Sequence, residues 1–172
     1  IEKETAVSAV INGNDGFGHI VGKMAMQIAI DKAKQNGIGM TVVNNSTHYG
    51  IAGYYSMMAA KQDVLGFSMT NTEALVVPTF GKTAMIGTNP IAVTMPAHPY
   101  PLHIDMATST VPAGKIEVYN KLAKPCPEGW ILNAEGKVTT VPQEFIDIRA
   151  NKTDGGLLPL GGAGELFSGH KG

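Results

Sequence analysis

Residues 43–53 contain the side chains of this sequence that are best suited to chemistry. Ser46 and His48 lie two positions apart, and Gly50 and Gly53 follow them. An imidazole can take up or release a proton near neutral pH, and glycine lets the backbone approach a ligand closely. One interpretation of the pattern is a proton-transferring site at His48. The competing interpretation is that Ser46 caps the next helix and that His48 is a hydrogen-bonded structural residue.

The segments on either side predict how this loop is held. Residues 38–43 are an apolar run without alternation, which predicts a strand buried on both faces. Residues 54–61 are rich in Met and Ala and predict a helix. A passage from strand through loop to helix presents a short exposed loop on a rigid scaffold, where α/β enzymes often carry functional residues.

The segment ahead of the loop predicts a strand, a loop and a helix at residues 6–11, 12–18 and 19–35. Within the expected helix, Ile20, Met24 and Ile28 recur every four residues and predict one apolar face. Asn36 and Gly37 then form a good helix stop.

Three glycines at the start of this helix imitate a dinucleotide-binding loop. Gly16, Gly18 and Gly22 give the spacing GxGxxxG. A Rossmann loop needs an acidic residue about 20 positions further on, at the end of the next strand. Here that strand ends in Asn44 and Asn45. We therefore interpret the glycines as turn and packing positions.

Later segments predict further strands at residues 64–70, 91–95 and 102–105. The last two are joined by a proline-rich connection, which His98 and His103 flank as expected surface residues. Hairpin-like connections are frequent, and helices and strands alternate only loosely. This favours an α+β fold with a mixed, largely antiparallel sheet flanked by helices.

The final third predicts one helix and one hairpin. The helix is expected over residues 109–123, with Ser109 and Thr110 as candidate N-caps. The hairpin is expected at residues 130–140. Residues 141–156 are expected to be irregular and exposed.

Three further polar segments leave two interpretations open. Residues 70–73 form either a polar turn or a binding loop. Residues 105–110 leave a strand and open the expected helix, so their N–H groups either bind a phosphate or are capped. Lys171, in the glycine-rich segment 155–172, either meets a phosphate or carboxylate or is a solvated charge.

Composition excludes several classes of protein. The chain has 172 residues, of which 44% are apolar and 16% charged, with a net charge of −1, which disfavours disorder and nucleic-acid binding. Its single cysteine, Cys126, fits a reducing compartment. No apolar run approaches the roughly 20 residues that span a bilayer. We expect a cytoplasmic protein without membrane contact, and no group of residues has the spacing of a metal site.

Several features predict that the chain is part of something longer. It starts at Ile1 without a methionine, and it ends in a polar run that resembles the entrance to a helix. Arg149 is its only arginine. Since enzymes usually bind a small carboxylate with the planar fork of an arginine, we expect such a clamp outside these residues.

Five motifs in series resemble one known family. They are Ser-Thr-His-Tyr-Gly at 46–50, Gly-Thr-Asn-Pro at 87–90, Asp-Met-Ala-Thr-Ser at 105–109 with Gly-Lys at 114–115, Leu-Pro-Leu-Gly-Gly at 158–162 and Gly-His-Lys-Gly at 169–172. In this order they resemble the malate/L-lactate dehydrogenase family of non-Rossmann NAD(P)-dependent oxidoreductases. Its relatives include sulfolactate and ureidoglycolate dehydrogenases and diketogulonate reductase.

The resemblance implies that residues 1–172 are the non-Rossmann cofactor-binding domain of a longer chain that forms homodimers. The N-terminal helical segment of the family, with a Ser-His-Gly motif and a following arginine, and its C-terminal helices have no counterpart here. The missing histidine is a rival to His48 as the acid.

The resemblance also implies the reaction and the roles of residues. His48 matches the catalytic acid or base, and Ser46 supports it or the substrate. The expected contacts with NAD or NADP are Thr72, Asp105, Met106, Ala107, Thr108, His170 and Lys171. The reaction is hydride transfer between nicotinamide and C2 of a small 2-hydroxy or 2-oxo acid. The alternatives are a reductase of cyclic C=N carboxylates and a non-catalytic nucleotide-binding or oligomerisation module.

Overall fold

The computed structural model describes residues 1–162 and divides the chain into two compact units. The first unit contains Ile1–Met69 and Ile91–Met106, and the second contains Thr70–Pro90 and the residues from Ala107 onward. The extent of one cofactor-binding domain over residues 1–172 stays a prediction.

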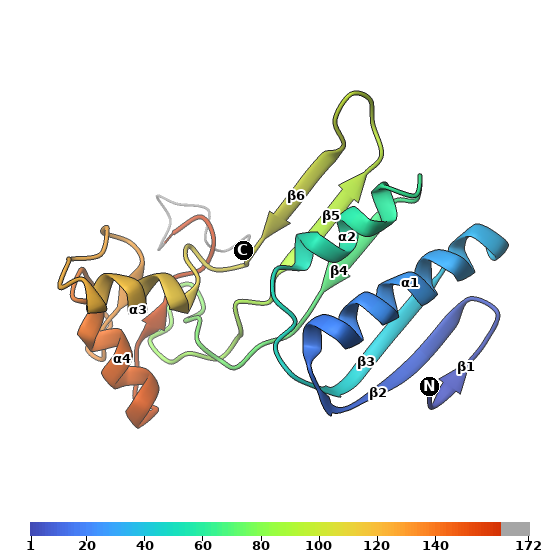
Figure 1. The fold of residues 1–172 in the computed structure, drawn as a ribbon. Helices are drawn as coiled ribbons and strands as arrows, with labels where there is room; N and C mark the ends of the chain where they lie inside the picture. Colours follow the sequence, from blue (N-terminus) through green and yellow to red (C-terminus); the bar gives the residue numbers. More distant parts are fainter. Residues whose placement is uncertain (163–172) are drawn as a thin grey trace. The chain divides into compact units, whose positions relative to one another are not determined.

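The first sheet of the first unit is built around a parallel pair of strands (Figure 1). Its strands, in spatial order, are β1 (Lys3–Glu4), β2 (Ser8–Gly16) and β3 (Met40–Ser46). β1 pairs with β2 antiparallel, and β2 pairs with β3 in parallel. A parallel pair needs a crossover, which the helix α1 (Gly18–Asn36) supplies.

The predicted loop at 12–18 is shorter than expected, because β2 continues to Gly16. The ladder with β3 shifts register between Asn12 and Gly16. Asn14 and Asp15 inside this irregularity have φ values of 48° and 55°. Asn and Asp tolerate the left-handed region better than most residues, so the strand accommodates a bulge where a loop was predicted.

The predicted helix at 19–35 is confirmed, but its apolar stripe does not face the sheet. Ala25 and Ile30 are buried, whereas Ile20 is 70% and Met24 47% exposed. Small residues suit the sheet-facing side because helix and strand approach closely there: Thr41 of β3 donates its hydroxyl to the Ala25 carbonyl at 3.1 Å. The helix ends as predicted at Gly37, whose φ is 84° and whose N–H binds the Ala33 carbonyl.

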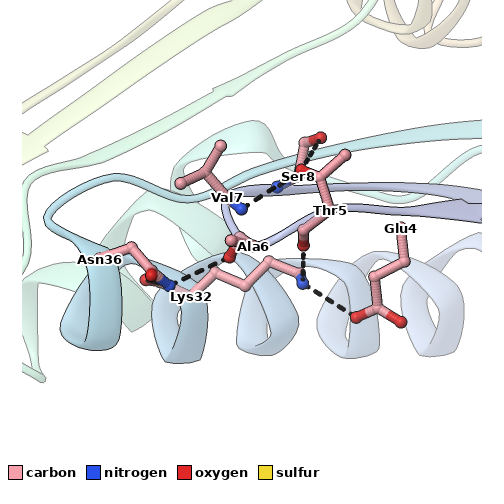
Figure 2. A network of polar contacts seen from close by, with 7 residues as sticks. All are labelled: Glu4, Thr5, Ala6, Val7, Ser8, Lys32 and Asn36. Carbon is pink, nitrogen blue, oxygen red and sulfur yellow. Dashed lines mark hydrogen bonds and ion pairs between the residues drawn. The ribbon is translucent and has the colours of Figure 1, made fainter.

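A polar network fastens the turn between β1 and β2 to α1 (Figure 2). Lys32 donates to Glu4 Oε1 at 2.9 Å and to the Thr5 carbonyl at 2.7 Å. Asn36 Nδ2 donates to the Ala6 carbonyl at 3.0 Å. The hydrogen bond from Lys32 and its positive charge lower the pKa of Glu4.

The prediction that residues 38–43 form a strand buried on both faces is wrong in its burial. Met40 is 58% and Val42 51% exposed, while Thr41 and Val43, which alternate with them along the strand, are partly buried. Within the described residues, α1 is the helix that packs against β3, and it covers one face of the strand. The side chains on the other face therefore stay exposed.

The second sheet of the first unit is antiparallel and confirms the strands predicted at 64–70, 91–95 and 102–105. Its strands are β4 (Gly66–Met69), β5 (Ile91–Met95) and β6 (Leu102–Met106). The helix α2 (Ala52–Ala60), also predicted, packs against this sheet (Figure 1). It buries Ser68, Ala92 and Thr94 on one face, whereas Phe67 and Met69 point the other way and are exposed.

The second unit packs two helices and a third small sheet around an apolar core. Its elements are α3 (Ala113–Lys121), β7 (Ile131–Leu132), β8 (Val138–Thr139), α4 (Pro142–Asn151) and β9 (Gly156–Leu157). The core consists of Leu75, Val76, Val111, Ile116, Cys126, Ile131, Phe145 and Leu157. Burial raises the pKa of the Cys126 thiol. The predicted hairpin is confirmed by β7 and β8, which are antiparallel.

Two predictions for this unit are wrong. Residues 141–156 include α4, which begins with Pro142 at its first position and buries Phe145 and Ile148 on one side. Ser109 and Thr110 cap no helix, since α3 begins at Ala113. Their hydroxyls donate instead to the carbonyls of Val111 and Leu158.

The α+β class is therefore confirmed, with the strands divided among three small sheets where one was expected. Within residues 1–162, five of the six strand pairings are antiparallel, in agreement with the predicted mixture. Over residues 1–162, no helix is both long and apolar enough to cross a membrane.

Candidate active site

His48 lies in the exposed loop that joins β3 to α2, where the sequence predicted it. Its Nδ1 accepts a hydrogen bond from the Gly50 N–H at 3.0 Å, and Gly50 has a φ of 84°. A ring nitrogen that accepts carries no hydrogen, so neutral His48 carries its proton on Nε2. The side chain thus presents an N–H donor, and it is not turned into the apolar interior.

Thr47 fastens this loop to the start of α1 and was missed in the sequence. Its hydroxyl accepts the Gly18 N–H at 3.0 Å and donates to the Gly16 carbonyl at 3.2 Å. A Cβ on Gly18 would overlap the carbonyl oxygens of Thr47 and His48. The glycines of the GxGxxxG run therefore serve turn and packing, as predicted, and the signal for Thr47 was its place inside the motif.

Ser46 ends β3 opposite Gly16 and is exposed. It does not cap α2, whose N-cap is Ile51, so that alternative is wrong. Among residues 1–162, no hydrogen bond joins Ser46 to His48. The supporting role of Ser46 stays a prediction.

The first turn of α2 is held by a carboxylate from another element. α2 has no side-chain N-cap bond and no acidic residue in its first turn. Asp105 of β6 fills this role, since its Oδ2 accepts the Gly53 N–H at 2.8 Å. A carboxylate also interacts favourably with the partial positive charge of a helix N-terminus.

Two stacked tyrosines stiffen the backbone between His48 and α2. The rings of Tyr49 and Tyr55 lie 4.7 Å apart and nearly parallel, and Tyr55 donates its hydroxyl to the Tyr49 carbonyl. Tyr49 also shares a 3.2 Å hydrogen bond with Ser68. Burial raises the pKa of both tyrosines, and the Asp105 carboxylate adds to the rise at Tyr49. Both therefore stay protonated hydrogen-bonding groups near neutral pH.

A groove of about 1020 Å³ borders this loop. Its walls are the exposed stripe of α1, including Ile20 and Met24, and residues of the loop and α2, including Ile51 and Tyr54. The apolar side chains that were predicted to form one face of this helix thus line the groove.

In the second unit, three polar segments that are distant in sequence meet. The Thr72 N–H donates to Asn89 Oδ1 at 3.0 Å, and the Thr88 N–H donates to Thr72 Oγ1 at 2.9 Å. The Thr108 N–H donates to the Thr88 carbonyl at 2.7 Å. A Cβ on Gly87 would overlap the side chains of Thr72 and Asn89, which explains a glycine at the start of the Gly-Thr-Asn-Pro motif.

The helix-terminus phosphate site considered for residues 105–110 is wrong. The N–H groups of Thr108 and Thr110 are bound to the carbonyls of Thr88 and Leu158, and no helix starts here. The exposed Thr72 hydroxyl and its neighbour Thr88 instead offer uncharged hydrogen-bonding groups.

The arginine of the second unit is already paired. Arg149 forms ion pairs with Glu73 and, at 2.9 Å, with Glu117. Lys82 pairs with Asp154 at 3.1 Å. The hydrogen bond from Thr83, together with that from Lys82, lowers the pKa of Asp154. Arg149 is thus committed to carboxylates of its own unit, and the carboxylate clamp outside these residues stays a prediction.

The predicted site residues are divided between the units. Ser46, His48, Asp105 and Met106 belong to the first, and Thr72, Ala107 and Thr108 belong to the second. His170 and Lys171 lie outside the described residues. Within residues 1–162, no three His, Cys, Asp or Glu side chains are grouped as metal ligands would be.

Comparison with known proteins identifies similar sequences and structures. A malate dehydrogenase of Pyrococcus horikoshii is 51% identical over 164 residues, which are 95% of this chain and 44% of that protein. An L-sulfolactate dehydrogenase of Methanocaldococcus jannaschii is 44% identical over 163 residues, which are 94% of this chain and 45% of that protein. The crystal structure of malate dehydrogenase from Entamoeba histolytica matches with a TM-score of 0.91 and 42% identity, over 98% of this chain and 47% of that one.

The chain therefore spans a little under half the length of the relatives that it matches. The family model described as malate/L-lactate dehydrogenase matches residues 1–172. This match confirms the resemblance seen in the five motifs: the chain belongs to the malate/L-lactate dehydrogenase family.

Proposed function

We propose that the complete protein is an NAD(P)-dependent oxidoreductase that interconverts a small 2-hydroxy acid and its 2-oxo acid. Membership of the family supports the reaction class, and the exposed, hydrogen-bonded His48 is the observation on which the proposal rests. When bound, the nicotinamide supplies or accepts a hydride.

His48 is the proposed proton-transferring residue. In its neutral form the Nε2–H points away from Gly50 and can bind the substrate oxygen. When His48 takes up a second proton, Nδ1 gains a hydrogen and can no longer accept the Gly50 N–H. In the reducing direction the imidazolium gives its Nε2 proton to the oxygen of the new alcohol, which leaves neutral His48 with its hydrogen on Nδ1. We therefore expect the contact between His48 and Gly50 to stay open until that hydrogen leaves Nδ1 and Nε2 is protonated again.

The proposed cofactor residues are Thr72 and Thr108, with Asp105, Met106 and Ala107 beside them and His170 and Lys171 beyond the described part of the chain. Thr72 is an exposed residue, so its hydroxyl, which accepts the Thr88 N–H and donates to the Glu73 carbonyl, can turn to an uncharged part of the nucleotide. The Asp105 side chain already binds Gly53, so it contributes to a ligand site mainly by shaping the loop. A non-Rossmann mode of binding, a homodimer and a cytoplasmic location belong to the same proposal.

The test is a panel of substrates on the complete polypeptide. Malate, lactate and sulfolactate, their 2-oxo acids and one cyclic imine carboxylate are each combined with NAD(H) and NADP(H), and the change in nicotinamide absorbance is followed. We expect turnover with at least one 2-hydroxy acid. Turnover of the imine alone would assign the imine reductase alternative, and cofactor binding without any turnover would assign the non-catalytic module.

A further inference from the structure

His103 has a buried hydrogen-bonding partner although it was predicted as a surface residue. It lies on β6 directly opposite Thr94 of β5, on the sheet face that α2 covers. Its Nδ1 lies 2.7 Å from Thr94 Oγ1. Thr94 is 0% exposed, so one side of the ring is anchored in the interior while the residue as a whole is exposed.

Two buried hydroxyls continue this contact to the first turn of α2. Thr94 Oγ1 lies 2.7 Å from Ser56 Oγ, and Ser56 is also 0% exposed. Ser56 donates its hydroxyl to the Gly53 carbonyl at 3.2 Å. A chain of three hydrogen bonds thus runs from His103 to the backbone of Gly53.

The three bonds can coexist in only one arrangement of hydrogens. Ser56 has a single hydroxyl hydrogen, and it goes to the Gly53 carbonyl, so Ser56 must accept from Thr94. The Thr94 hydrogen is then used, so Thr94 must accept from His103. His103 therefore carries its hydrogen on Nδ1, the opposite of neutral His48.

The same strand also holds the N–H of Gly53. Asp105, two residues after His103, accepts that N–H at 2.8 Å. A Cβ on Gly53 would lie 2.5 Å from Asp105 Oδ2 and 2.7 Å from His103 Nε2. β6 therefore holds both backbone polar groups of Gly53, one directly and one through the buried hydroxyls. This residue lies three positions after Gly50, whose N–H binds His48.

We propose that His103 is a positioning residue that, as the Nδ1–H tautomer and through Thr94 and Ser56, fixes the first turn of α2 and hence the loop that carries His48. Its effect on turnover rests on the proposed function. The hydrogen-bond chain itself does not, and the two are tested separately.

The tautomer is tested by ¹⁵N NMR of the complete protein labelled at histidine. At a pH where both side chains are neutral, we expect the hydrogen of His103 on Nδ1 and that of His48 on Nε2. A hydrogen on Nε2 of neutral His103 would reverse the chain of donors and overturn the inference. This measurement does not depend on any enzymatic activity.

The positioning is tested by two substitutions of similar size. His103→Asn can place an amide N–H where Nδ1 lies, whereas His103→Gln places its amide near the position of Nε2. We expect His103→Asn to retain most of kcat, and His103→Gln and Thr94→Val to lower it roughly 10-fold, because one lost hydrogen bond displaces the loop. The KM for the cofactor stays unchanged.

His98→Ala, which removes an exposed histidine from the connection between β5 and β6, is the matched control. Backbone amide shifts of Gly50 and Gly53 should move in His103→Gln and Thr94→Val but not in His103→Asn or His98→Ala. Equal shifts and equal kcat in the Asn and Gln variants would refute the positioning role. If neither the unsubstituted protein nor any variant turns over a 2-hydroxy acid, only the proposed function fails. The amide shifts still decide whether His103 positions the first turn of α2.

Discussion

At the scale of single residues, the hydrogen-bonding partner of each ring nitrogen determines what His48 can do. The Gly50 N–H holds Nδ1 of His48 and leaves Nε2 as the atom that can meet a ligand. Because the loop is exposed, this nitrogen is accessible without any rearrangement of the core. The chemistry of the proposed reaction therefore depends on a side chain that contributes little to folding.

His48→Ala is expected to lower kcat by about 10² to 10⁴-fold, the usual contribution of general acid–base catalysis. Cofactor affinity and thermal stability should change little, because the lost side chain is exposed. Steady-state kinetics and equilibrium cofactor titration of the complete protein measure these effects. His98→Ala serves as control, and a kcat within twofold of the unsubstituted protein would exclude the role of His48.

Gly53→Ala tests the close approach of α2 to β6. The added methyl group would meet Asp105 and His103, and forcing a methylene into a packed site typically costs about 1–3 kcal/mol. Gly114 is also the second residue of a nine-residue helix, but nothing lies within 4 Å of the position that a methyl group would take there. Gly114→Ala should therefore be neutral or stabilise by up to about 1 kcal/mol. Chemical denaturation measures both effects. Equal shifts of the denaturation midpoint in the two variants would show that the close approach of α2 to β6 is not what destabilises Gly53→Ala.

At the scale of elements, polar side chains decide where helices and turns are fastened. Lys32 of α1 reaches both Glu4 and the Thr5 carbonyl and so holds the turn between β1 and β2 (Figure 2). The loop before α2 is fastened by Thr47 to α1, and the helix itself by Asp105. The elements of the first unit are thus joined to one another by polar contacts that hydrophobic periodicity does not reveal.

The Glu4 contact predicts a local dependence on pH. The pKa of Glu4 is lowered in the folded protein, so its carboxylate stabilises the turn fully at pH values above the ordinary pKa of 4.5. This stabilisation is lost as the pH falls through the lowered pKa. Hydrogen exchange of the Ser8 and Val10 amides, compared between about pH 5 and pH 3, should show the loss of protection.

Lys32→Met should remove this pH dependence, because it removes the partner of Glu4. Lys34→Met is the matched control, since Lys34 binds the neutral side chain of Gln62. If both variants keep the same pH dependence as the unsubstituted protein, the contact of Lys32 with Glu4 is not its cause.

At the scale of the whole molecule, elements with strong local signals could be predicted and their environments could not. Gly37 ended α1 where expected, and the antiparallel strands β5 and β6 agree with their predicted ranges within one residue. The prediction of burial failed where burial depends on tertiary packing, since Met40 on β3 is exposed. The predicted apolar stripe of Ile20 and Met24 lines a groove. Sequence periodicity shows which face of an element is apolar, but not what packs against it.

The candidate site was predicted where a residue type was unusual and missed where geometry made an ordinary residue important. His48 was singled out because a histidine followed by two glycines is chemically distinctive and because it matches a motif of the family. Thr47, Thr94 and Ser56 have common side chains, and their roles appear only when distant segments meet. α4 was missed because polar residues lie among its few buried side chains, Pro142, Phe145 and Ile148.

Cofactor binding should stabilise the complete protein by mass action. A ligand at 100 times its dissociation constant adds about 2.7 kcal/mol to the free energy of unfolding, so NADH or NADPH should raise Tm by several degrees. Thr72→Val removes the exposed hydroxyl and should reduce this shift, since a lost hydrogen bond weakens binding by about 1 kcal/mol or roughly fivefold. His48→Ala should keep the full shift although it turns over slowly.

Thr139→Val, in β8 of the same unit, is the matched control for the loss of a threonine hydroxyl. Each variant is compared with its own ligand-free Tm, so a change in basal stability does not enter. The two substitutions thus separate binding from proton transfer: Thr72 should affect the thermal shift and the cofactor KM, and His48 should affect kcat. A normal shift in Thr72→Val would remove Thr72 from the cofactor site, whereas an absent shift in His48→Ala would mean that the histidine binds the cofactor as well.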